Sequence, residues 1–142
     1  MFSFLLSKKG GEAYKEVQKD YDNLVKIIEA FNGKLHIPIN RADLLKFPIG
    51  VWVEVNEFVK VRRRKHRFKT YLNFDTIMEK GGEFGSHFHE DLIESCEIEY
   101  GKMQDLEDNK IYIKGDVMEY NKGYKHTPIA LEKTRLHVLF KP

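Results

Sequence analysis

The sequence predicts an all-β domain, a barrel or sandwich, preceded by one amphipathic helix. After residue 50, apolar residues recur at every second position, which is the period of a strand buried on one face. The chain is rich in aromatic residues, with ten Phe, seven Tyr and one Trp, and these favour strands. Several short strands that follow a single helix argue against a parallel sheet. A length of 142 residues fits one domain.

Residues 12–31 have the periodicity of an amphipathic helix. Their apolar positions are three or four residues apart: Tyr14, Val17, Tyr21, Leu24, Ile28 and Phe31. Asn32-Gly33 is a good stop, because glycine adopts the left-handed conformation easily. We expect the apolar face to pack on the barrel or on a partner subunit.

Residues 34–50 contain two prolines and are interpreted as a connector, with one short helical turn within 40–47. We therefore divide the chain into an N-terminal helix and connector, 1–48, and a barrel domain, 49–142.

The strand pattern begins with five valines that share one face of a first strand: Val51, Val53, Val55, Val59 and Val61. A second strand has an apolar face made of Phe68, Leu72, Phe74 and Met78. We expect the chain to turn around 63–67. Further short strands are predicted at 93–100, 111–113, 117–120 and 135–140, and breaks rich in Gly, Asp or Asn separate several of them.

Charge is unevenly distributed, although the net charge is only +2. Residues 60–69 carry seven of the 24 Lys and Arg, while residues 90–108 carry eight acidic residues and one Lys. We expect these two segments to lie side by side or to be solvated. The small net charge argues against nucleic acid as a partner. The basic stretch also lacks interleaved aromatic residues on which bases could stack.

The single cysteine excludes an internal disulfide and fits a reducing compartment. The apolar start MFSFLL is too short for a signal peptide or a transmembrane helix. We therefore expect a cytoplasmic protein with no membrane partner.

Alternation over the strand 93–100 turns a carboxylate inward. Ser95, Glu97 and Glu99 form a wholly polar face, which must meet water, so Glu94 and Cys96 face the interior. A buried carboxylate without a partner costs several kcal/mol, and coordination of a metal ion removes that cost. A salt bridge to Lys or Arg is the alternative.

Two histidines precede this strand. His87 and His89 are two residues apart, so on an extended backbone their side chains point the same way. Together with Glu94 they offer a ligand set suited to Fe, Mn, Ni, Co, Cu or Zn. A fourth ligand, His126, follows directly after the tight turn at 121–123 and can reach a metal held by the first segment.

These two segments resemble the paired motifs of the cupin family. The first motif is matched by Gly81, His87, His89, Glu94 and Gly101 at every spacing, and the second by Gly115, Gly123 and His126. Asn121 stands where the family usually has Pro, and Ala130 where it often has Asn.

The resemblance covers roughly 50–140. It implies the cupin jelly roll, a double-stranded β-helix barrel, with a divalent metal bound by His87, His89, Glu94 and His126.

Three further residues are candidates for lining a pocket. Cys96 shares the inward face with Glu94, Tyr124 lies two residues from His126, and Glu57 interrupts the valine face. Glu57 is either solvent-facing at a bulge or, if it points inward, an acid or base. Cys96 is either a small buried apolar residue or a contact beside the metal.

The sequence thus predicts a metal-binding cupin, with an enzyme of dioxygenase, isomerase or lyase type acting on a small organic molecule as its main interpretation. It identifies no general acid or base. A non-catalytic cupin that binds or senses a small ligand is the alternative. We expect a homodimer, formed through the helix or through the sheets.

Overall fold

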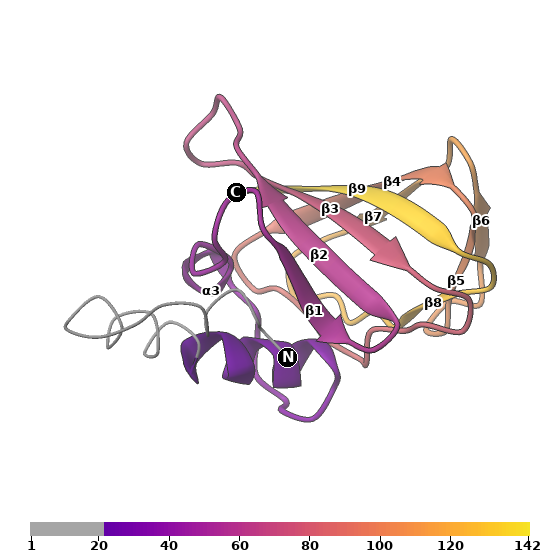
Figure 1. Cartoon of the computed structure of the whole chain (residues 1–142), viewed down its shortest axis with the longest axis horizontal. Coiled ribbons are helices and arrows are strands. Elements are labelled where there is room, and N and C mark those ends of the chain that lie inside the picture. The colour runs from indigo at the N-terminus through magenta and orange to yellow at the C-terminus, as the bar shows by residue number, and fades with distance from the viewer. Residues whose placement is uncertain (1–21) are drawn as a thin grey trace.

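The computed structural model describes residues 22–142, and its strands form two antiparallel sheets that enclose the core (Figure 1). The strands are β1 Trp52–Asn56, β2 Val59–Arg64, β3 Leu72–Met78, β4 Ile93–Tyr100, β5 Lys102–Asp105, β6 Ile111–Ile113, β7 Val117–Tyr120, β8 Pro128–Ala130 and β9 Thr134–Lys141. Antiparallel strands in two facing sheets are the jelly-roll fold of the cupins, as the sequence predicts.

The larger sheet has six strands in the order β1-β2-β3-β9-β4-β7. The last strand in the sequence, β9, lies between β3 and β4 and pairs with both. Along β9 the side chains alternate strictly: Leu136, Val138 and Phe140 are buried, while Arg135 and His137 lie on the outer face. The sheet is therefore apolar inside and charged outside.

The smaller sheet has the order β6-β5-β8 and closes the core from the other side. It contributes Met103 and Ala130, both at most 1% exposed. The β4–β5 connection is a single glycine, Gly101, at a φ of 100°, which only glycine adopts without strain.

Residues 22–31 are helical, and the predicted stop is confirmed by Gly33, whose φ is 74°. The buried face includes Leu24 and Phe31, as predicted, and also Ile27 and Ala30. The part of the predicted helix at 12–21 lies outside the described residues.

The connector contains the predicted short turn as α3, Arg41–Leu44. Between residues 22 and 142, no helix is long and apolar enough to cross a bilayer.

Three strand predictions are corrected by the structure. The valine face belongs to a β1–β2 hairpin rather than one strand, because the chain turns at Glu57-Phe58 while Val59 returns to the same buried face. Phe68 is 49% exposed in the β2–β3 loop and not part of β3. The strands β5 and β8 were not predicted, since four and three residues are too few to show a period.

Within residues 22–142, no ion pair joins the basic stretch to the acidic segment, so the side-by-side alternative fails, while most of 64–69 is exposed, as the solvated alternative predicts. Two arginines of the stretch pair instead with Asp75 of β3, which is 4% exposed. Its Oδ2 atom lies 2.9 Å from Nη2 of Arg62 and 3.0 Å from Nη1 of Arg64, and Arg135 approaches to 3.4 Å. The Nδ1 atom of His137 lies 2.9 Å from its other oxygen. The outer face of the large sheet is thus organised around one carboxylate.

Gly85 lies against the end of the helix. A Cβ atom at this position would meet the carbonyl carbon and oxygen of Asn32 at 2.2 Å. Only a glycine therefore allows the segment before His87 to pack against the end of the helix.

We expect Gly85→Ala to lower the free energy of unfolding by about 3 kcal/mol or more, because backbone atoms must move apart. Gly115→Ala is the matched control: its φ is 90°, but a Cβ there meets nothing within 4 Å, so it should cost only about 1–2 kcal/mol. Denaturant unfolding of both variants measures the difference. Equal losses would show that the helix does not pack this closely.

Both ring nitrogens of His137 face carboxylates, Nδ1 that of Asp75 and Nε2 that of Glu99 at 3.0 Å. Partial burial alone would lower the pKa of His137, but these two hydrogen bonds outweigh it and raise the pKa above its ordinary value. The charged ring is favoured in the folded state. Its contribution to stability is therefore complete below about pH 6.5 and is lost as the pH rises through the folded pKa.

We accordingly predict that the stability difference between the wild type and His137→Gln is largest below about pH 6 and shrinks towards about pH 9. Unfolding free energies of both proteins across this range provide the test. A difference that grows with pH would contradict the charged state of His137.

Candidate metal centre

Three imidazoles converge inside the barrel. The ligand atoms offered by His87, His89 and His126 all lie within 4.8 Å of one another. The three residues are 4%, 2% and 1% exposed, so the cluster is shielded from bulk water.

Backbone pairing brings the two predicted segments together at the histidines themselves. His87 and His126 form an isolated antiparallel bridge, with the N–H of each donating to the carbonyl of the other at 3.2 and 3.1 Å. The N–H of Gly123 donates to the carbonyl of His89 at 2.6 Å. The turn that ends at Gly123, with a φ of 78°, therefore also positions the backbone of His89.

Each imidazole is oriented by a backbone carbonyl. The Nδ1 atom of His87 lies 2.8 Å from the carbonyl oxygen of Gly85, and that of His89 lies 2.5 Å from the oxygen of Ile39. The Nδ1 atom of His126 lies 3.2 Å from the oxygen of Tyr124. Since a carbonyl only accepts, Nδ1 carries the proton in all three rings. In the neutral rings, the Nε2 lone pairs remain free to bind a metal.

Glu94 completes the group from β4. Its Oε1 atom lies 2.9 Å from Nε2 of His126 and 3.4 Å from Nε2 of His89. Despite these distances, all three atoms are buried without a hydrogen bond of acceptable geometry. In this tautomer the Nε2 lone pairs of the two histidines face the lone pairs of Oε1, which is unfavourable unless a cation lies between them.

Electrostatics favours the ligand forms of two of these residues. Burial lowers the pKa of His87 well below its ordinary value, and His126 and His89 lower it further, so its ring is neutral. Burial alone would raise the pKa of Glu94, but positive charge at the positions of His126 and His89 outweighs it and lowers the pKa well below its usual range; beside neutral rings, a bound cation would supply that charge. The group therefore presents a carboxylate beside imidazole nitrogens.

Aromatic rings surround the imidazoles. The centroid of Phe31, at the end of the helix, lies 5.1 Å from that of His87, and the centroid of Phe84 lies 5.4 Å from the same ring. Phe140 packs edge-on against His89 at 4.9 Å. The polar group is thus held in an apolar shell, which strengthens its interaction with any cation.

A buried polar chain supports His126 from behind. Tyr120 stacks on the His126 ring with a centroid distance of 4.0 Å and an interplanar angle of 10°. Its hydroxyl donates to Oδ2 of Asp105 at 2.9 Å, and Asp105 is fully buried. Oδ1 of Asp105 accepts from the backbone N–H of Thr127, which follows His126.

The thiol of Cys96 donates to Oε2 of Glu94 at 3.3 Å. Burial raises the pKa of Cys96 well above its ordinary value, and the neighbouring carboxylate raises it further. Cys96 is therefore a protonated hydrogen-bond donor that turns the other oxygen of Glu94 towards the imidazoles.

The structure brings together all four predicted ligands but separates the predicted pocket residues. Cys96 contacts Glu94. Tyr124 is 47% exposed, and only its carbonyl reaches His126. Glu57 lies exposed in the β1–β2 turn, outside the barrel, so its inward alternative is wrong.

The roles of Tyr120 and Asp105 and the contact of His89 with Ile39 are not predicted from the sequence. Alternation offered a signal for the first: Tyr120 is directly opposite Glu94 in the β4–β7 register and so shares its inward face. The Ile39 carbonyl left no signal, because any residue can supply it.

Solved structures with a similar fold include cupins. KdgF from Halomonas sp. superimposes with a TM-score of 0.60 at 19% identity, covering 68% of this chain and 94% of that one. An RmlC-like cupin from Shewanella frigidimarina gives 0.58 at 17%, covering 68% and 89%. Ectoine synthase from P. lautus gives 0.53 at 17%, covering 61% and 66%. No protein-family model matches the sequence, and neither does any curated protein.

The likeness to these structures establishes the fold, and the chain is a cupin-fold protein. The three-histidine group could hold a metal ion, and the donor set fits one.

We predict that Cys96→Ala weakens divalent-metal binding about tenfold, because Glu94 loses the donor that orients it. Cys96→Ser is the matched control, since its hydroxyl still donates to Oε2. Competition against a chromophoric chelator measures both dissociation constants. Equal affinities for the two variants would show that Cys96 is merely an apolar filler.

Proposed function

We propose that this protein is a metal-binding cupin whose centre holds one divalent transition metal ion through His87, His89, Glu94 and His126. The observation that carries the proposal is the set of buried acceptors without hydrogen bonds: Nε2 of His89, Nε2 of His126 and Oε1 of Glu94. An interior cation satisfies all of them at once.

The metal would be Fe, Mn, Ni, Co, Cu or Zn, because imidazole and carboxylate donors suit all of these ions. Such a metal polarises a substrate oxygen or activates O₂, and four protein ligands leave coordination positions open on a six-coordinate ion. The chain itself holds the three imidazoles in one tautomer through backbone carbonyls and keeps bulk water away with Phe31, Phe84 and Phe140.

We propose further that the centre is catalytic and acts on a small organic molecule in a dioxygenase, isomerase or lyase type of reaction. The fold supports catalysis elsewhere, since one similar structure is an ectoine synthase. Phenylalanines pack closely against the imidazoles, so we expect a substrate of this centre to be small.

A non-catalytic role in binding or sensing a small ligand is the second candidate. It is favoured by the two titratable groups next to the ligands, which are both committed: Cys96 to Glu94 and Tyr120 to Asp105. Burial raises the pKa of Tyr120 far above its ordinary value, so its phenol is a poor proton donor or acceptor at neutral pH.

Cobalt-substituted protein separates the two candidates. We expect its visible spectrum to shift when small chelating organic acids are added, because they occupy the open positions, and we expect at least one of them to be consumed. A spectral shift without consumption of any of them would favour the sensor. No shift with any of them would contradict an open metal centre. A titration of metal-free Glu94→Gln with cobalt is expected to show weaker cobalt binding than the wild type.

A further inference from the structure

The outer face of the large sheet carries one cross-strand row of side chains with a regular charge order. Five strand pairings place six residues side by side, from β1 to β7: Trp52, Arg62, Asp75, His137, Glu97 and Val117. Read across the sheet, the row is apolar, positive, negative, positive, negative, apolar. His137 counts as positive because both its ring nitrogens face carboxylates.

This order is complementary to its own reverse. If the row is laid against a reversed copy of itself, Arg62 meets Glu97, Asp75 meets His137, and the apolar ends Trp52 and Val117 meet each other. Reversal of a row is what two-fold symmetry produces, and a two-fold dimer uses one self-complementary patch on both subunits.

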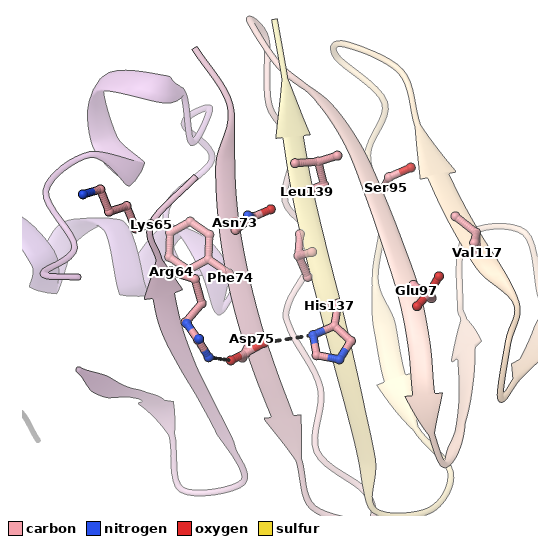
Figure 2. A pocket seen from close by; sticks show the side chains of 11 residues that line it. Arg64, Lys65, Asn73, Phe74, Asp75, Ser95, Glu97, Val117, His137 and Leu139 are labelled. Carbon is pink, nitrogen blue, oxygen red and sulfur yellow. Dashed lines mark hydrogen bonds and ion pairs between the residues drawn. The ribbon is translucent and has the colours of Figure 1, made fainter. Parts of the chain in front are cut away.

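The neighbouring rows keep the same polarity. The β2 side carries Lys60 and Arg64, while the β4 and β7 side carries Glu99 and Glu119. Figure 2 shows the depression between the two sides: Arg64 and Lys65 lie on one side, Ser95, Glu97 and Val117 on the other, and Asp75 with His137 between them.

Several of these groups are available to a partner. Arg64 has a side-chain exposure of 53%, and Val117 is 45% exposed. Glu97 is exposed, and within residues 22–142 it makes no ion pair. An exposed carboxylate without an ion-pair partner is a ready partner for a cation from another molecule.

We propose that this face is the interface of a homodimer, with the large sheets of two copies packed face to face around a two-fold axis parallel to the strands. The charges select this axis. An in-plane axis perpendicular to the strands would place β2 against β2 and join cation to cation, whereas the parallel axis places β2 against β4 of the partner.

The size of the face suits a modest interface. Six strands about 4.8 Å apart and about five residues of 3.4 Å each span roughly 29 by 17 Å, so two copies contribute about 1,000 Å² of projected area. This projected area is slightly below the roughly 1,200 Å² at which standard specific interfaces begin, so we expect a weak dimer. The proposal does not depend on the metal centre.

Charge reversal tests the interface, with sedimentation equilibrium or light scattering as the readout. We expect the wild type to be a dimer. Glu97→Lys and Arg62→Glu should each raise the dissociation constant at least tenfold, because residues 62 and 97 face each other across the interface and then carry like charges. Asp75 keeps Arg64, Arg135 and His137 in Arg62→Glu, so the fold should persist, which the melting temperature checks.

Mixing the two single variants gives the sharpest result. In the mixed dimer both contacts between residue 62 of one subunit and residue 97 of the other again join opposite charges, so an equimolar mixture of the Arg62→Glu and Glu97→Lys chains should dimerise although neither does so alone. Glu132→Lys, on the exposed β8–β9 turn, makes the same change of charge away from the face and should leave the dimer intact.

A monomeric wild type overturns the proposal. So does a dimer that both reversals leave unchanged, which would move the interface to another surface such as β6, where Ile111 and Ile113 are 53% and 55% exposed. Dissociation by both single variants without rescue in the mixture overturns the pairing of β2 with β4.

Discussion

The structure depends on the short antiparallel bridge between His87 and His126. It joins two segments that are 39 positions apart in the sequence by two backbone hydrogen bonds. Because the bridge is antiparallel, the two side chains emerge as neighbours, and their ring centroids lie 4.2 Å apart. The flanking turn ending at Gly123 and the close approach of Gly85 to the helix keep this pairing in place. The site is therefore a consequence of how the barrel closes.

The backbone around the histidines explains why we propose a cation at this centre. Backbone carbonyls accept hydrogen bonds from the Nδ1–H groups, so the Nε2 lone pairs point at one another and at Glu94. Burial removes the water that would otherwise satisfy them. A protein that only needed a stable core would gain from apolar residues here, so the arrangement supports the proposed metal ion over a role in packing alone.

Local rules predicted the parts of the fold that have a clear period. The alternation in 93–100 gave β4 at its observed bounds and turned Glu94 and Cys96 inward, and Asn32-Gly33 ended the helix. The hairpin at Glu57-Phe58 was missed, because Val59 resumes the buried face after a turn of two residues and so preserves the apparent period.

The surroundings of the site could not be predicted in the same way. Tyr120 and Phe140 reach the imidazoles through the sheet register, and Phe31 reaches them because the helix packs on the barrel. The ion pairs of the basic stretch likewise follow from the β2–β3 register, which places Arg62 opposite Asp75. Register is a property of the whole sheet, so a single strand does not reveal it.

The most direct test of the metal centre is elemental analysis of the protein purified without added metal or chelator, beside a His87→Ala/His126→Ala double variant. We expect about one equivalent of a transition metal in the wild type and none in the variant. A redox metal such as Fe would direct attention to O₂ chemistry, whereas Zn, Ni or Mn would favour isomerase, lyase or binding roles. Absence of metal from both proteins, together with a wild-type stability that divalent ions do not change, would contradict the account and leave a cupin barrel without a metal centre.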